Sequence, residues 1–202
     1  MKEGFLSILK FFFFLLILPL IVASVLAFQI QVLAIPAGKE QWFFWGAVIF
    51  ILFFLFLYQF KEVYTFGQTI VSNLLKFFEP LSGIGGLIVP IYTLLLACLY
   101  LILNVIGITG KYEGYLILAL GFSIAMHIVL TAQQMYEGDS SPIKAQYLFS
   151  FGLTLIVNIF IMALLLGIAI PEFSFVGFFQ SLSSQTASYY QSIYKILFIS
   201  PS

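Results

Sequence analysis

The chain has 202 residues, of which 62% are hydrophobic and only 8% charged, and its mean hydropathy is +1.14. A soluble domain usually has about a quarter of its residues charged, so this composition excludes a water-soluble protein and predicts an integral membrane protein. Eight lysines balance eight acidic residues and arginine is absent, which excludes a basic patch for nucleic acid and recognition by guanidinium groups. The single cysteine, Cys98, has no partner for an internal disulfide and is expected to pack as a small apolar residue.

The first apolar segment covers about residues 8–29 and predicts a transmembrane helix that Pro19 kinks. Its basic flank and the small residue Ala27 also fit a secretory signal, but we predict that the segment is retained as a span. A second span is predicted at about 42–60. Two tryptophans open it, as is typical of a membrane–water boundary.

Residues 62–79 predict an amphipathic helix, because apolar and polar side chains alternate there at helical spacing. The apolar positions are Phe66, Ile70, Leu74 and Phe77, and the polar positions between them are Gln68, Ser72 and Lys76. Such a helix either lies in the membrane interface or packs across other helices. The glycine cluster at residues 83–86 lacks the Lys-Ser/Thr of a phosphate-binding loop and predicts a turn.

Three further spans are predicted at about 87–108, 115–135 and 147–170, with a short reversing loop at 109–114. The aromatic and serine-rich tail, 172–202, is expected to form an interfacial helix near 174–198. The fold class is therefore all-α: a polytopic transmembrane helical bundle of about five spans plus one amphipathic interfacial helix. Residues 1–202 are expected to form a single integral membrane domain.

Five spans would place the two termini on opposite sides of the membrane. The amino-terminal side would then carry five lysines against three on the other side, which favours a cytoplasmic amino terminus. The five are Lys2, Lys10, Lys61, Lys76 and Lys144, and the three are Lys39, Lys111 and Lys195. We expect the bilayer to be a bacterial inner membrane.

Two polar stripes run along the fourth and fifth predicted spans, at a spacing that puts each stripe on one helix face. The first consists of Ser123, His127 and Thr131, and the second of Ser150, Thr154 and Asn158; Gln134 is a further candidate for the lining of a polar path. A polar stripe is costly against lipid, so the two are expected to face each other or a third helix, with Asn104 of the third span as a further candidate. These residues form either a helix-packing contact or a polar path.

No catalytic, cofactor-binding or metal-binding constellation is predicted. A zinc site needs about three protein ligands, and one histidine with one isolated cysteine cannot supply them. Ser123 precedes His127 by one helical turn, but no orienting acid and no Gly-x-Ser-x-Gly motif accompany them. The loop at 137–144 lacks the ligand spacing of a calcium loop.

The order of features from Tyr64 to Ile170 resembles integral membrane metalloproteins of the site-2-protease type. Gln68, Thr69 and Ser72 stand where that family has its His-Glu-x-x-His motif, and the Pro90-to-Tyr92 stretch resembles its later Pro-Tyr span. The resemblance implies a non-catalytic relative that has lost its zinc motif.

The leading hypothesis is a non-enzymatic subunit or scaffold of a larger membrane complex, whose partners are the bilayer and other membrane subunits or a second copy. The alternative is a small transporter, channel or lipid-handling protein with a polar path past His127. The inactive protease relative is the third hypothesis.

Overall fold

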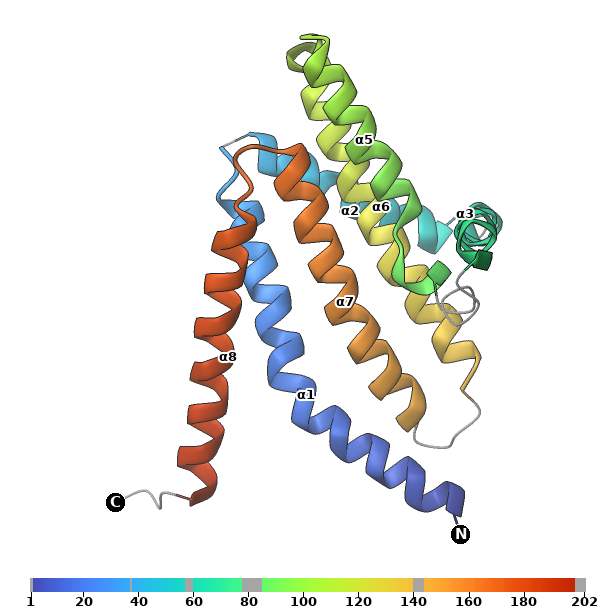
Figure 1. The fold of residues 1–202 in the computed structure, drawn as a ribbon, viewed down its shortest axis with the longest axis vertical. Helices are drawn as coiled ribbons and strands as arrows, with labels where there is room; N and C mark the ends of the chain where they lie inside the picture. The colour runs from blue at the N-terminus through green and yellow to red at the C-terminus, as the bar shows by residue number, and fades with distance from the viewer. Residues whose placement is uncertain (1, 37, 57–59, 78–84, 140–143, 199–202) are drawn as a thin grey trace.

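The computed structural model describes residues 2–36, 38–56, 60–77, 85–139 and 144–198, and all the regular secondary structure in these ranges is helical. The helices are α1 (Lys2–Leu33), α2 (Lys39–Phe56), α3 (Phe60–Leu74), the 3-10 turn η1 (Leu75–Phe77), α5 (Ile91–Val105), α6 (Thr109–Glu137), α7 (Ala145–Ala169) and α8 (Phe175–Phe198) (Figure 1). A further helical turn covers residues 85–88. The predicted all-α helical bundle is confirmed.

Four of the described helices, α1, α2, α6 and α7, are long and apolar enough to cross a membrane. The third predicted span, 87–108, is instead the shorter apolar helix α5, which has 15 residues and starts only after Pro90. Residues 109–114 were expected to form a loop, but they are the first turns of α6, which begins at Thr109. The chain therefore reverses over residues 106–108, which are fewer than expected.

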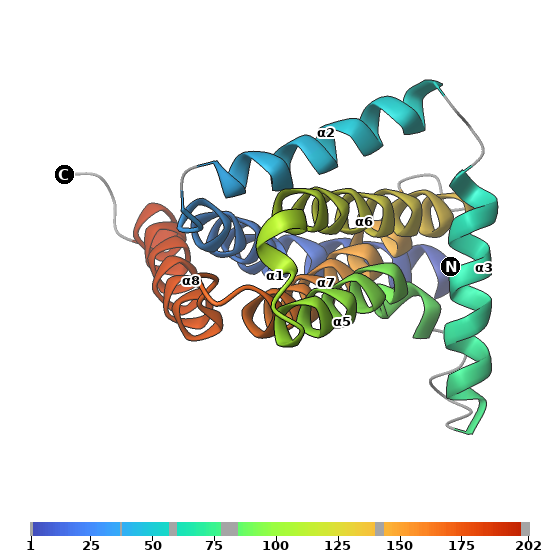
Figure 2. The ribbon, with the colours of Figure 1, turned by 90° about the horizontal axis from the view of Figure 1, so that it is seen from above.

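The predicted amphipathic helix at 62–79 corresponds to α3 and η1, while residues 78 and 79 lie outside the described part of the chain. Figure 2 shows α3 from the side, lying across the ends of α5 and α6, so the helix packs across other helices. The face that packs is not the expected one. Tyr64, Gly67 and Val71 are buried, whereas Phe66 and Leu74 are exposed and available to lipid.

The tail forms a helix close to the predicted bounds, but α8 does not lie across the end of the bundle as an interfacial helix would. It runs antiparallel to α1 along the length of the bundle, and the two termini lie at the same end (Figure 1). The sequence was expected to place the termini on opposite sides of the membrane. That expectation did not count the tail helix among those that run along the bundle, and the side on which each terminus lies stays a prediction.

The helices α2 and α6 approach each other until their backbones touch. A methyl group on Gly46 would lie 1.9 Å from the carbonyl oxygen of Leu118, and one on Gly121 would lie 2.0 Å from that of Phe43. Small residues permit this kind of close backbone packing between membrane helices, where van der Waals contact replaces the hydrophobic effect as the driving force. The pair of glycines therefore fixes where α2 crosses α6.

Ion pairs join the helices at both ends of the bundle. Lys39 lies 2.8 Å from Glu113 of α6 and 3.0 Å from Glu172, which precedes α8. At the opposite end of α6, Lys61 lies 2.9 Å from Glu137. The charged groups thus gather at helix ends, as a bundle embedded in a bilayer requires.

Candidate functional site

Three of the predicted polar residues share the buried face of α6. Ser123, His127 and Thr131 are 3%, 4% and 0% exposed. They are four residues apart, so they lie one above the other along the helix. The face they share is covered by α3, α5 and α7 and not by lipid.

Hydroxyl groups from two neighbouring helices pair with this stripe. Ser123 Oγ lies 3.1 Å from Thr93 Oγ1 of α5, and Thr131 Oγ1 lies 2.5 Å from the Tyr64 hydroxyl of α3. The Tyr64 ring also packs on the His127 imidazole, with ring centroids 5.9 Å apart. These contacts tie α3 and α5 to α6, and the stripe is expected to contribute mainly to helix packing.

A proline-broken helix lies beside the stripe. Pro90 has no N–H group to donate to the carbonyl of Gly86, and the N–H of Ile91 donates to Val89 (2.9 Å) in place of Leu87. Two partly buried carbonyls, those of Gly86 and Leu87, are thereby left without their helical partners. An unpaired carbonyl inside a membrane costs several kcal/mol, so other groups must serve both.

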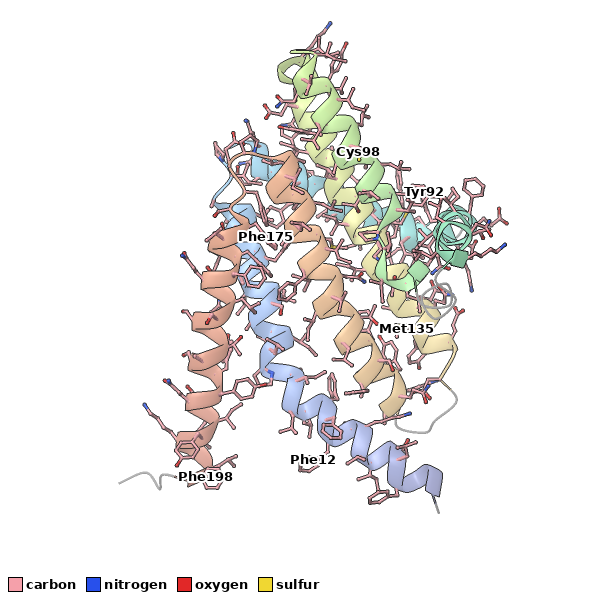
Figure 3. The ribbon with its side chains drawn as sticks, in the orientation of Figure 1. Phe12, Tyr92, Cys98, Met135, Phe175 and Phe198 are labelled. Atoms are coloured by element: carbon pink, nitrogen blue, oxygen red, sulfur yellow. The ribbon has the colours of Figure 1, made fainter. Side chains whose placement is uncertain are left out.

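Side chains from α3 and α7 serve these two carbonyls. Gln68 Nε2 lies 3.5 Å from the Gly86 oxygen, and Asn158 Nδ2 donates to the Leu87 oxygen at 3.3 Å. Tyr92, at the start of α5, points toward α3 and donates to the carbonyl of Val63 at 2.5 Å (Figure 3). Gln68 and Asn158 therefore act as caps for the broken helix.

Two polar atoms of this cluster have no hydrogen-bond partner among the described residues: His127 Nε2 and Asn158 Oδ1. The two side chains lie against each other, with the Leu87 backbone also against the imidazole. A neutral imidazole protonated on Nε2 would donate to Oδ1 after a small adjustment and satisfy both atoms. No group of three possible metal ligands among His, Cys, Asp and Glu occurs in the described part of the chain.

The structure does not bring the other predicted residues into hydrogen-bond contact with His127. Asn104 is exposed at the far end of α5, and Gln134 is exposed and accepts a hydrogen bond from Gln68 at 2.7 Å. Ser150 and Thr154 are half-buried on α7, and no hydrogen bond among the described residues joins them to His127. The two stripes therefore meet only where His127 faces Asn158.

An apolar groove of about 490 Å3 lies next to the cluster, between α5 and α6 and beside α3. Leu95, Leu99, Phe122 and Met126 line its sides, and Ser123 is a polar residue at its wall. His127 does not line the groove and is almost fully buried. The groove can accept an apolar chain, but it does not give a polar solute access to the imidazole.

Sequence reasoning missed an exposed polar face on α8. Gln180, Ser184, Ser188, Gln191 and Lys195 are four, four, three and four residues apart, which puts them on one side of the helix. All five are exposed, and none has a hydrogen-bond partner among the described residues. The spacing of these five residues is visible in the sequence. The tail was expected to form an interfacial helix, however, and the polar side of such a helix faces water, so the five residues did not indicate a binding surface.

Contacts with α1 show how this face is placed. The Tyr190 hydroxyl donates to the carbonyl of Leu16 at 2.6 Å, and Gly177 lies against the side chain of Gln31. Since both α1 residues belong to a candidate span, α8 runs alongside a helix that is long and apolar enough to cross a membrane. Compared with models of protein families, with curated proteins and with solved structures, the chain matches none of them.

Proposed function

We propose that this protein is a non-enzymatic integral membrane protein that acts as a subunit or scaffold of a larger membrane complex. The observation that supports the proposal is the exposed polar face of α8 beside a membrane-spanning helix. Amides and hydroxyls at that depth are costly against lipid tails, and polar groups of another helix would satisfy them. In the buried cluster around His127, the two unpartnered atoms, His127 Nε2 and Asn158 Oδ1, are able to pair with each other after a small adjustment.

We further propose a bacterial inner membrane with a cytoplasmic amino terminus. Because α8 runs back toward the amino-terminal end of the bundle, Lys195 joins the lysines of that side. By chain order, six lysines then lie on the amino-terminal side and two, Lys39 and Lys111, on the other. Six against two favours this orientation more than the five against three counted from five spans.

The test is recovery of the tagged protein from its membrane in mild detergent, followed by mass spectrometry. We expect defined partner chains, or further copies of this chain, in a fixed ratio. A variant in which Gln180 and Gln191 are both changed to Leu should lose them, while Phe179→Leu, on another side of α8, should retain them. A solitary monodisperse monomer, obtained from native membrane in the mildest detergent, would contradict the proposal.

A second hypothesis is a small transporter, channel or lipid-handling protein with a path past His127. The unpartnered atoms His127 Nε2 and Asn158 Oδ1, beside a broken helix, favour it, because transporters often bind solutes at such breaks. Reconstituted protein should then move a solute, and His127→Ala should reduce the flux. Unchanged flux would remove the histidine from the mechanism.

The third hypothesis, an inactive relative of an intramembrane zinc protease, makes Gln68 a replacement for a zinc ligand. In the structure the Gln68 amide caps Gly86 and binds Gln134 instead. Stoichiometric zinc in the purified protein would contradict the loss of the metal site.

A further inference from the structure

We propose that α8 crosses the membrane and that its exposed polar face binds α8 of a second copy of this chain. The inference names the partner within the complex proposed above, and it therefore rests on that proposed function. It depends on three features of α8: its depth relative to α1, the chemistry of its exposed face, and the symmetry that a membrane imposes on two copies.

The depth of α8 follows from its two contacts with α1. Gly177 lies opposite Gln31 and Tyr190 opposite Leu16, so 13 residues of α8 run past 15 residues of α1 in the opposite direction. That stretch of α1 lies inside the candidate span Gly4–Leu33. With 24 residues, α8 is about 36 Å long, enough for a hydrocarbon core of about 30 Å. The helix is therefore long enough to cross the bilayer, but it is not one of the four described helices that are also apolar enough to do so. Its two contacts with α1, and not its hydropathy, place it at membrane depth.

The exposed face of α8 cannot be satisfied by lipid. The register with α1 places Gln191 at the level of Leu16, near the middle of the candidate span. A serine hydroxyl is able to bond to its own helix backbone, but a glutamine amide offers two donors and an acceptor that its own helix does not use. In the bilayer core each unsatisfied group costs several kcal/mol. A polar surface must therefore cover Gln180 and Gln191.

A second copy of α8 has the chemistry to provide that surface. Copies of one chain share their orientation in a membrane, so a twofold axis along the membrane normal brings the same residues of two helices together at the same depth. Glutamine and serine both donate and accept hydrogen bonds, so each pairs with itself. The small residues Ser184, Ala187 and Ser188 on this face allow close approach of the two backbones.

The carboxyl-terminal end of the same face is hollowed. A hollow of about 510 Å3 lies there, lined by Tyr190, Gln191, Tyr194 and Lys195. Lys195 is the one charged residue of α8 and stands in its last turn, at the end of the bundle that carries both termini. Water and headgroups at that boundary screen two facing lysines from each other.

The first test is the side of the membrane on which each terminus lies. A reporter that fluoresces only in the cytoplasm, fused in turn to the amino and carboxyl ends, should give the same result at both. Opposite results would show that α8 does not cross the membrane and would overturn the inference.

The second test is cross-linking between two differently tagged copies in the membrane. In a Cys98→Ser background, Ser184→Cys and Ser188→Cys should form disulfides between copies on mild oxidation, because the two helices meet there. Phe179→Cys and Ile193→Cys are also exposed on α8 but lie on other sides of the helix, and they should not. The Gln180→Leu/Gln191→Leu variant should retain its helical circular dichroism and lower co-purification of the two tags about tenfold.

The outcomes separate this inference from the proposed function. If the tags co-purify but Ser184→Cys cross-links no better than Phe179→Cys, the interface on α8 is wrong. If other chains co-purify and a second copy does not, the identity of the partner is wrong while the subunit hypothesis stands. If nothing co-purifies, both fail.

Discussion

Asn158 is expected to stabilise the fold by capping the Leu87 carbonyl, and the change Asn158→Leu tests this. The side chain is 1% exposed and its Nδ2 lies 3.3 Å from the carbonyl oxygen. Leucine has the same number and branching of side-chain heavy atoms but no donor, so the carbonyl loses its partner inside the bundle. A buried unpaired acceptor costs about 1–3 kcal/mol, and the long hydrogen bond here points to the lower part of that range, about 1–2 kcal/mol.

The assay is unfolding in mixed micelles with increasing dodecyl sulfate, followed by circular dichroism. Asn104→Leu is a matched control, because it makes the same chemical change at an exposed position at the far end of α5. It should change the free energy of unfolding by less than about 0.5 kcal/mol. A second control changes Pro90 to alanine, which lets the helix continue and the Ile91 N–H return to the Leu87 carbonyl.

In the Pro90→Ala background, Asn158→Leu should therefore cost less than it does in the natural chain. The two changes form a double-mutant cycle whose coupling energy reports the cap directly. The reasoning is refuted if Asn158→Leu is as stable as the natural protein, or if its cost is the same in both backgrounds. If Asn104→Leu lowers the free energy of unfolding as much as Asn158→Leu does, the cost comes from the loss of an amide in general and not from the loss of the cap on the broken helix.

Three further predictions follow from contacts elsewhere in the bundle. Gly46→Ala should destabilise the protein by about 1–3 kcal/mol in the same unfolding assay, because its methyl group would lie 1.9 Å from a carbonyl oxygen of α6. The control Gly110→Ala should not destabilise the protein in this way, because a methyl group there has no neighbouring atom within 4 Å. Tyr64→Phe should cost about 1 kcal/mol through loss of its hydroxyl partner on α6. The hydrogen bond from Lys39 holds the pKa of Glu172 below its ordinary value of 4.5, so its stabilisation is complete above that pH and is lost as the pH falls through the lower folded-state pKa. Glu172→Gln should accordingly melt below the natural protein at pH 7, and the two melting temperatures should converge in acid; a constant difference would contradict this.

The sequence predicts the apolar helices well, because their length and hydropathy depend on local composition alone. The segments expected at 8–29, 42–60, 115–135 and 147–170 coincide with α1, α2, α6 and α7, and their bounds differ by about one to six residues. The stripe of Ser123, His127 and Thr131 was also foreseeable, since residues four apart share a helix face. What that stripe contacts was not, because Tyr64 and Thr93 come from distant parts of the chain.

The broken helix shows where local reasoning stops. Pro90 signals that a helix is interrupted, but it does not say which side chains serve the two carbonyls it releases. Gln68 and Asn158 precede and follow it by 22 and 68 residues along the chain. Their role depends on the packing of α3 and α7 against one point, which only the folded structure brings together.

The placement of α8 was missed for a different reason. The mean hydropathy of a segment averages over all sides of the helix. A helix with one apolar and one polar side therefore has an intermediate value, which predicts a helix in the membrane interface. Phe178 and Leu182 are buried against the bundle, while Gln180 and Ser184 between and beside them are exposed. A helix of this kind is compatible with the bilayer when a partner covers its polar side, and the chain alone does not reveal the partner.

The two polar regions should therefore respond oppositely to mutation. Polar groups that find partners within their own chain serve the fold, and the caps at the broken helix belong to this kind. Those on the exposed face of α8 have no such partner among the described residues, and we propose that they serve association. Asn158→Leu should lower the free energy of unfolding and leave co-purification of two tagged copies unchanged in membranes where the protein is folded. Gln191→Leu should weaken co-purification of the two tagged copies. It should leave the free energy of unfolding of the single chain unchanged or raise it slightly, because an apolar group replaces an exposed amide at membrane depth. If Asn158→Leu abolished association while the protein stayed folded, the buried cluster and not α8 would carry the contact with the partner.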